Sequence, residues 1–241
     1  MRVVAAQIPM APTVTGNLAR VFAAVRAAGA DLVVFPECTL TGFHRGLPEL
    51  LQSRDLAECD GRLRRLARET GKAVLVGRPM ETEHGVLNVV QCFAPGQPVQ
   101  WVAKVGLTPS ETRFFSAPLP GSPASAGLLR VGSLRLGVVL CREVLDAQHP
   151  RLVGADLIVW PGYIQWTGDG AYLDAAKDHC RSLRVPMLQC NWATSLNAPD
   201  TVGMGGSVAL DANGGLVAQA AMDCADTLQI SVNLGHRAST D

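Results

Sequence analysis

Few residues of this 241-residue chain are charged, and neither sign of charge predominates. Asp, Glu, Lys and Arg make up 17% of the sequence, with 21 basic and 21 acidic residues. Such a balance provides no net electrostatic field to attract nucleic acid or an anionic membrane surface. Hydrophobic residues make up 48%, which excludes an intrinsically disordered chain. We therefore expect an enzyme for a small molecule, with neither nucleic acid nor membrane as a partner.

Long hydrophobic runs and paired cysteine motifs are also missing. The opening MRVVAAQIPM goes directly into a strand-like pattern without the apolar region of a signal peptide, and no run of 18 apolar residues follows. The seven cysteines are odd in number and widely spaced, and none forms a CxxC pair. This pattern predicts reduced thiols in a cytoplasmic protein, with no disulfide framework or zinc site. No spacing of His, Asp and Glu indicates another metal site.

Apolar strands alternate with amphipathic helices near the start of the sequence. Residues 2–8 and 31–36 have the pattern of buried strands, and residues 17–28 have that of an amphipathic helix. Asp60 is predicted to cap a second helix that ends at Gly71, because Asp is a favoured first residue and Gly a favoured last one.

The middle of the sequence is rich in strands. Short apolar runs joined by Gly and Pro turns occupy residues 87–140, and a helical pattern returns at residues 172–183 before further strands. No linker, repeat or low-complexity tract interrupts the sequence, so we expect one domain over residues 1–241. This order favours two sheets covered by helices. The pattern alone does not distinguish that α/β arrangement from one doubly wound sheet.

Three segments share a design in which an apolar strand ends at a reactive side chain. DLVVFPE ends at Glu37, VQWVAK ends at Lys104 and LRLGVVLC ends at Cys141. Ligand sites in α/β folds collect at the carboxyl ends of strands, so we expect these side chains to converge. Each also has a simpler explanation. The glutamate could be a helix cap, the lysine a solvated charge and the cysteine an inert core residue.

The three segments resemble the signatures of the nitrilase, or carbon–nitrogen hydrolase, superfamily. GADLVVFPECTLTGF (29–43) is similar to the first signature, KVGLTPSETRFF (104–115) to the second and LRLGVVLCREV (134–144) to the third. Further agreement extends over essentially the whole sequence, at Ala6-Gln7, 154–161, 185–191 and Gly205-Gly206-Ser207. The resemblance implies an α/β (α+β) fold, namely a four-layer α-β-β-α sandwich with two mixed sheets. It also implies a homo-oligomer, usually a dimer.

The resemblance further implies the role of each signature residue. Cys141 is expected to be the nucleophile and Glu37 the general base, while Lys104 stabilises the oxyanion. Glu111 is expected to orient Lys104 or the substrate, and a surface charge at a helix cap is its alternative. The implied reaction is hydrolysis of a small amide, nitrile or carbamoyl compound through a cysteine thioester, with no cofactor.

One departure from the family pattern concerns the substrate. An aromatic residue often follows the nucleophile, Trp in nitrilases and commonly Tyr in amidases, whereas Arg142 stands here. We therefore expect a carboxamide or carbamoyl substrate, and Arg142 is a candidate for pairing with a substrate carboxylate. The other candidates for substrate binding are aromatic and could equally belong to the core: Phe43, Phe115, Tyr163 and Trp166.

Several alternatives stay open at this point. Nitrile hydrolysis would use the same chemistry, and a catalytically silent member would act as a binding module. The intact Glu37, Lys104 and Cys141 argue against silence, and a redox sensor at Cys141 would not require the other two. A cysteine–histidine enzyme is disfavoured, because no cysteine-protease context surrounds any of the five histidines, His44, His84, His149, His179 and His236.

Overall fold

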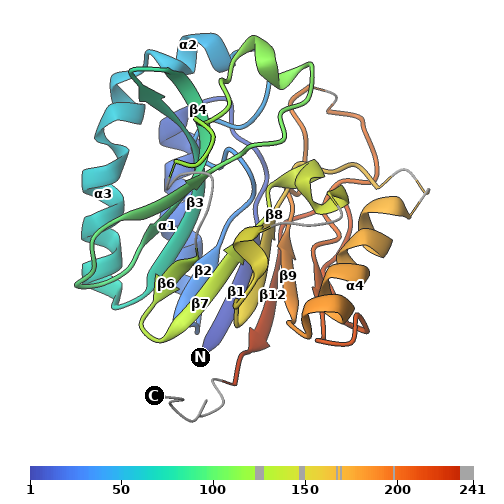
Figure 1. Cartoon of the computed structure of the whole chain (residues 1–241). Coiled ribbons are helices and arrows are strands. Elements are labelled where there is room, and N and C mark those ends of the chain that lie inside the picture. Colours follow the sequence, from blue (N-terminus) through green and yellow to red (C-terminus); the bar gives the residue numbers. More distant parts are fainter. Residues whose placement is uncertain (123–127, 147–149, 167, 169, 198, 234–241) are drawn as a thin grey trace.

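Two six-stranded sheets lie face to face in the computed structural model, with helices on their outer sides (Figure 1). The structure describes residues 1–122, 128–146, 150–166, 168, 170–197 and 199–233. Helices α1 (Val14–Ala27) and α3 (Arg54–Thr70) cover the first sheet, and α4 (Ala171–Leu183) covers the second. The predicted four-layer α-β-β-α sandwich is therefore confirmed, and the single doubly wound sheet is excluded.

The first sheet has the strand order β12-β1-β2-β3-β4-β5. The neighbours β1, β2 and β3 are parallel, whereas β12, β4 and β5 join by antiparallel pairing, so the sheet is mixed. The strand β5 lies at the edge of this sheet. The strands are β1 (Arg2–Gln7), β2 (Leu32–Val34), β3 (Ala73–Thr82), β4 (Gly85–Phe93), β5 (Gln100–Ala103) and β12 (Asp226–Ser231).

The second sheet has the order β11-β10-β9-β8-β7-β6 and is also mixed. Its central strands β7, β8 and β9 are parallel, and the outer strands pair antiparallel. A hairpin around Asn213-Gly214 joins β10 to β11. The strands are β6 (Leu129–Val131), β7 (Leu134–Val138), β8 (Leu157–Pro161), β9 (Met187–Cys190), β10 (Val208–Leu210) and β11 (Leu216–Gln219).

The strands are apolar on both faces because each sheet packs on two layers. Successive side chains of a strand point to opposite faces. In β1, Val3 and Ala5 contribute to the core between the sheets, whereas Val4 and Ala6 pack towards α1 and α3. Continuous apolar runs are the expected pattern for such strands. This double burial explains why the sequence pattern identified them.

The start of α3 differs from the prediction. Asp60 lies inside this helix, which begins at Arg54, and the side chain of Ser53 accepts the Asp55 N–H as its cap. Asp60 instead forms an ion pair with Arg78. The buried face of α3 begins before Asp60, with Leu56 and Cys59, and continues through Leu63 and Leu66 at helical spacing. The predicted end is confirmed at Gly71, whose φ is +68°. The short helix α2 (Leu47–Leu51) was not predicted.

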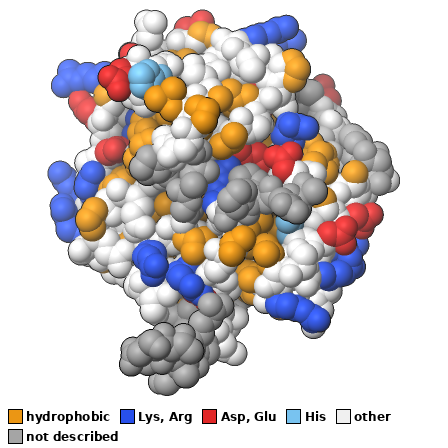
Figure 2. All heavy atoms as spheres, in the orientation of Figure 1, with side chains coloured by type: hydrophobic (Ala, Val, Ile, Leu, Met, Phe, Trp, Pro, Cys, Tyr) orange, Lys and Arg blue, Asp and Glu red, His pale blue; other side chains and the backbone are white. Residues whose placement is uncertain are grey.

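Basic and acidic side chains are interspersed on the face of the molecule shown in Figure 2. This distribution agrees with the equal numbers of basic and acidic residues in the sequence. Within the described part of the chain, no helix combines the length and the hydrophobicity needed to cross a membrane.

Candidate active site

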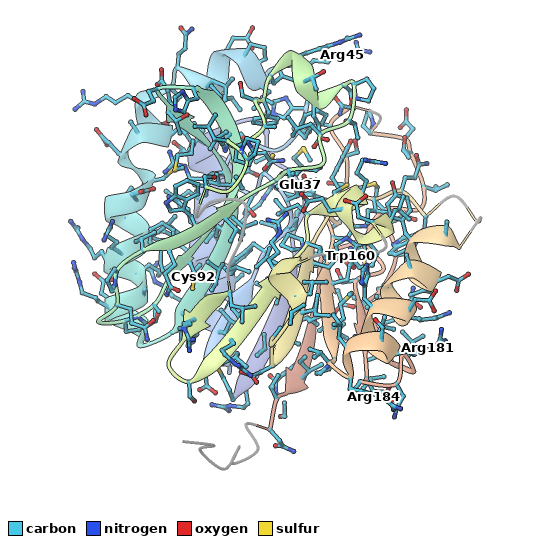
Figure 3. All side chains as sticks on the ribbon, in the orientation of Figure 1. Glu37, Arg45, Cys92, Trp160, Arg181 and Arg184 are labelled. Carbon is cyan, nitrogen blue, oxygen red and sulfur yellow. The ribbon has the colours of Figure 1, made fainter. Side chains whose placement is uncertain are left out.

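The three predicted catalytic residues follow strands whose carboxyl ends share one region of the molecule. Glu37 comes shortly after β2, Lys104 directly after β5, and Cys141 opens the 3-10 helix η2 (Cys141–Leu145) after β7. Two antiparallel pairings separate β5 from β3, so β5 runs in the same direction as β2 and β3. Glu37 lies in the interior of the molecule, whereas Arg181 and Arg184 lie at the outer helix α4 (Figure 3).

Lys104 bridges two buried carboxylates. Its Nζ donates to Glu37 Oε1 at 2.8 Å and to Glu111 Oε1 at 2.5 Å. The exposed fractions of the three side chains are 1% for Lys104, 4% for Glu37 and 7% for Glu111. This burial excludes a solvated surface charge for the lysine and for Glu111. The other carboxylate oxygen of Glu111 accepts the Thr108 N–H at 2.8 Å, which fixes the orientation of that side chain.

These contacts also fix the charge of Lys104. Burial alone would lower the pKa of its ammonium, but Glu37, a Cys141 thiolate and Glu111 outweigh burial and raise the pKa above the ordinary lysine value. An ammonium has three N–H donors. Two of them point to carboxylates, and the third has no acceptor among the described residues.

Glu37 is held from both its side chain and its backbone. Asn88 Nδ2 donates to Glu37 Oε1 at 2.9 Å, and Trp192 Nε1 donates to the Glu37 carbonyl at 2.8 Å. A Cβ at Gly77 would collide with the backbone N of Cys38, so glycine allows the turn after Glu37 to lie directly on β3. Burial raises the pKa of the Glu37 carboxyl, Lys104 opposes this, and Glu111 adds to it.

Sequence reasoning did not identify Asn88 as a site residue. It occupies the middle of β4, in the apolar segment LNVVQC, and is completely buried. The signal that could have found it is an amide in an apolar strand, because a buried amide requires hydrogen-bond partners, although Gln91 in the same strand gives the same signal. The partners of Asn88 are Glu37 and the Cys38 thiol.

Cys141 adopts a backbone conformation that side chains other than glycine seldom adopt. Its φ is +49°, in the left-handed region, and the residue is half-buried. Trp160 Nε1 donates to the Cys141 carbonyl at 2.8 Å, and Cys141 Sγ lies 3.7 Å from the Tyr163 carbonyl oxygen. Burial raises the pKa of the Cys141 thiol to about 12, with Glu37 adding to the shift and Lys104 opposing it. The resting thiol is therefore protonated at neutral pH.

Arg142, the residue after Cys141, has two hydrogen-bond donor groups that are unused in the described structure. Among the residues that the structure describes, neither the backbone N–H nor the guanidinium of Arg142 has a hydrogen-bond partner. The side chain is half-buried, and its Nη1 lies 3.9 Å from the position that a Cβ at Gly106 would take. Gly106 belongs to the loop that begins at Lys104, so Arg142 lies beside this loop.

Comparison of the sequence with known protein families identifies the family of this chain. The family model described as carbon–nitrogen hydrolase matches residues 2–240. The chain belongs to this family.

Among curated proteins, a Pseudomonas protegens hydrolase from the pqqF 5' region is 33% identical over 172 residues, which cover 67% of this chain and 59% of that protein. A glutamine-dependent NAD(+) synthetase of Xylella fastidiosa is 30% identical over 162 residues, which cover 61% of this chain and 29% of the synthetase. The chain thus matches less than two thirds of the length of either relative.

Solved structures of nitrilase-superfamily proteins share the fold of this carbon–nitrogen hydrolase. A mutant amidase from Nesterenkonia sp. AN1, with acrylamide added at the active-site cysteine, superimposes with a TM-score of 0.82 at 19% identity, covering 97% of this chain and 93% of the amidase. A CN-hydrolase superfamily protein from Xanthomonas campestris, with an arsenic adduct in its active site, gives a TM-score of 0.78 at 16% identity, covering 97% and 91% of the two chains.

Three of the four aromatic candidates, Phe43, Phe115 and Tyr163, lie close to one another. The ring centroid of Phe43 lies 6.4 Å from that of Phe115 and 6.3 Å from that of Tyr163. Phe114, which was not predicted, joins them at 6.0 Å from Phe43. Of these residues, Tyr163 also contacts Cys141, because its backbone carbonyl oxygen lies 3.7 Å from Cys141 Sγ.

Trp166 lies outside the aromatic cluster. Its ring packs edge-on against Trp160, with 6.3 Å between the ring centroids, and its Nε1 donates to the Gly205 carbonyl at 2.8 Å. Trp166 therefore packs on the residue that donates to the Cys141 carbonyl and has no ring contact with the aromatic cluster in the described part of the chain.

The histidines do not form a second catalytic group in the described structure. His179 is buried, with its Nε2 2.9 Å from the Val144 carbonyl oxygen. His149 and His236 lie outside the described residues. Within the described ranges, no group of three or more His, Cys, Asp and Glu side chains could hold a metal ion.

A cavity of about 760 Å³ has a lining that does not include Lys104, its two carboxylates or Cys141. Its lining comes from α2, the start of α3, β3, β4 and the segment around Phe114, and includes Arg54, Arg78 and Arg113. Arg78 is already paired with Asp60, and Arg54 with Glu58. The candidate site therefore rests on the buried charges around Lys104 and not on this cavity.

Proposed function

We propose that this carbon–nitrogen hydrolase cleaves a small carboxamide or carbamoyl compound to an acid and ammonia through a thioester on Cys141. The observation that carries this proposal is the buried Lys104, held between Glu37 and Glu111, with Cys141 opening the neighbouring η2 turn. The amidase from Nesterenkonia supports it by analogy, since that protein adds acrylamide at its active-site cysteine and a mutant of it binds butyramide.

The first step is attack by the sulfur. The raised pKa of Cys141 keeps the thiol protonated, so the thiol must lose its proton during attack. Glu37 accepts this proton, and Sγ forms a bond to the amide carbon while the carbonyl electron pair moves to oxygen. The third N–H of Lys104 and the backbone N–H of Arg142 donate to the resulting oxyanion. Each such donor contributes about 3–4 kcal/mol of transition-state stabilisation.

The second step releases the amine and then the acid. Glu37 gives its proton to the nitrogen, the carbon–nitrogen bond breaks and ammonia leaves, which forms the thioester. Glu37 then removes a proton from water, whose oxygen attacks the thioester carbon, and the proton returns to the sulfur as the acid leaves. Glu111 keeps the Lys104 ammonium aimed at the oxyanion throughout, through its 2.5 Å hydrogen bond.

Arg142 suggests which amides suit the site. A half-buried guanidinium without an ion-pair partner among the described residues favours a ligand with a carboxylate, because arginine pairs with that group in a bidentate geometry. The match to glutamine-dependent synthetases agrees with an amide that also carries a carboxylate. We therefore propose ω-amides of dicarboxylic acids as preferred substrates, with the aromatic cluster of Phe43, Phe114, Phe115 and Tyr163 beside the acyl chain.

Ammonia release from matched compounds tests the proposal. The panel pairs each amide with its nitrile, and each compound with a distal carboxylate with its neutral analogue. Amides should react faster than nitriles, and carboxylate-bearing amides should have the lower KM. Arg142→Met should remove the second preference. Faster turnover of nitriles contradicts the amidase proposal, and equal KM values contradict the role of Arg142.

The family resemblance further predicts a homodimer, and the unpaired cysteine pattern predicts a cytoplasmic location. Light scattering of the purified protein would test the dimer, since a monomeric mass would contradict it. Fractionation of the source cells would test the location.

A further inference from the structure

The position of Lys104 raises a structural problem. It directly follows β5, the edge strand of its sheet, which pairs with β4. Cys141 follows β7, which belongs to the other sheet. Nothing in the strand pairing of either sheet sets the distance between the lysine and the sulfur, yet the chemistry depends on that distance. Reactive groups must keep their relative positions to within about 0.5 Å.

Glu143 connects the two loops that carry these groups. Its Oε1 accepts the backbone N–H groups of Val105 at 2.6 Å and Gly106 at 3.1 Å, just after Lys104. Its Oε2 accepts the backbone N–H of Leu140 at 2.9 Å, just before Cys141. One carboxylate therefore binds the backbone next to the lysine and the backbone next to the nucleophile.

Arg151, in the 3-10 helix η3 (Pro150–Leu152), completes the connection. Its Nη2 donates to both oxygens of Glu143, at 2.8 and 2.9 Å. Its Nη1 donates to the Ala103 carbonyl at 2.8 Å, on the other side of Lys104. The Glu143–Arg151 pair thus binds the chain before and after Lys104, and the chain before Cys141.

The burial of this pair argues against a role in stability alone. Both side chains are 0% exposed. A buried ion pair recovers little more than the cost of removing its charges from water, and apolar residues of similar volume often give equal or greater stability. The directional hydrogen bonds to four backbone groups are the feature that apolar residues could not replace.

We propose that Glu143 and Arg151 are positioning residues that hold the Lys104 ammonium at the working distance from the Cys141 sulfur. This proposal rests on the proposed function, because it assigns the pair to the same reaction. Misplacement of a reacting group by about 1 Å can slow catalysis roughly a hundredfold. Loss of the pair should therefore reduce kcat by about that factor and leave KM nearly unchanged, since neither side chain is assigned to the substrate.

A double variant separates positioning from stability. Glu143→Gln or Arg151→Met alone leaves a buried charge without its partner and should lower the melting temperature. Glu143→Leu combined with Arg151→Met removes both charges and should recover the part of that loss that the unpaired charge causes, although the four backbone groups still lose their partners. If the pair positions the site, the double variant melts at a higher temperature than either single variant but keeps the low kcat. Recovery of kcat together with the melting temperature would overturn the proposal.

The chain offers a matched control pair. Arg135 donates to both oxygens of Asp156, at 3.0 and 2.8 Å, and Asp156 also accepts the Arg135 backbone N–H at 2.9 Å. This pair joins the starts of β7 and β8, at the opposite end of the strand from Cys141. Arg135→Met with Asp156→Leu should leave kcat unchanged. A fall in kcat equal to that of the Glu143–Arg151 double variant would overturn the specific role.

Alkylation of Cys141 provides a measurement that does not need a substrate. Lys104 lowers the pKa of the thiol, so a displaced lysine leaves less thiolate, and a rise of one pKa unit means about tenfold less. The Glu143–Arg151 double variant should react more slowly with iodoacetamide at a fixed alkaline pH, whereas the control pair should not. If the wild-type protein hydrolyses no amide, the proposed function fails, while slower alkylation would still support the positioning.

Arg151→Lys keeps the proposal testable if the double variant does not fold. Lysine retains the charge in the buried position but cannot bind both Glu143 oxygens and Ala103 in the same planar arrangement. We expect a folded protein with a lower kcat, an unchanged KM and slower alkylation. Wild-type kcat in this variant would overturn the proposal.

Discussion

Replacement of Lys104 by methionine is the most direct test of the buried centre. Methionine keeps an unbranched apolar stem but removes the ammonium that binds Glu37 at 2.8 Å and Glu111 at 2.5 Å. The two carboxylates then lie in the interior without their shared cation. Removing one partner of a buried ion pair costs about 3–5 kcal/mol of unfolding free energy. Losing an oxyanion donor lowers kcat by roughly a hundredfold to a thousandfold.

The loss of stability should depend on pH in a defined direction. Lys104 lowers the pKa of Glu37, whereas burial and Glu111 raise it, so the variant should have a Glu37 pKa still further above the ordinary value of 4.5. A carboxyl whose pKa is raised in the folded state stabilises that state while protonated. This contribution is complete below the unfolded-state pKa and is lost as pH rises through the folded-state pKa. The variant should therefore be closest to wild type in mild acid and furthest from it at neutral pH.

Urea unfolding followed by tryptophan fluorescence, at neutral and mildly acidic pH, measures the loss of unfolding free energy. Ammonia release at saturating amide measures the loss of kcat. Lys177→Met is a suitable control, since Lys177 lies on α4, is 27% exposed and pairs with the exposed Asp174. The control should change neither quantity. Wild-type stability and wild-type kcat in Lys104→Met at neutral pH would refute both the buried ion bridge and its role at the oxyanion.

Three further predictions concern the same centre. Cys141→Ala should abolish turnover and leave the fold intact, whereas Cys38→Ala should retain turnover; the reverse result would reassign the nucleophile. As pH is lowered, kcat/KM should fall with a midpoint above 4.5, the ordinary pKa of glutamate. Glu37 must be ionised to accept the thiol proton, and its pKa is raised. A midpoint below that value would exclude Glu37 as the base. Extended dialysis against a chelator should not change the rate, and inactivation that zinc reverses would contradict the metal-free mechanism.

Local patterns in the sequence predicted most of the strands but not how they are arranged. Runs such as DLVVFP are apolar throughout because β2 is covered on both faces, and this double burial produces a clear signal. The pairing of two sheets face to face depends on contacts between segments far apart in the sequence. The four-layer arrangement therefore came from the family resemblance, since the pattern alone also allowed one doubly wound sheet.

The sequence likewise predicted the main residues of the candidate site but not the partners that hold them. Glu37, Lys104 and Cys141 stand at strand ends, where position alone raises the expectation of chemistry. Their partners leave no local pattern: Asn88 lies 51 residues from Glu37, and Glu143 lies 38 residues from Val105. Such contacts become visible only when the fold brings the segments together.

The bridge of one ammonium between two carboxylates has a consequence for the charge of the interior. With both carboxylates ionised and the thiol neutral, the centre carries one net negative charge. When the thiol proton moves to Glu37, the negative charge moves to the sulfur and then to the oxyanion, and it returns to Glu37 as ammonia leaves. The total is the same in every state of the proposed cycle. No counter-ion has to enter or leave with the proton, so the rate of bond cleavage should be nearly insensitive to salt concentration, unlike the binding of a charged substrate.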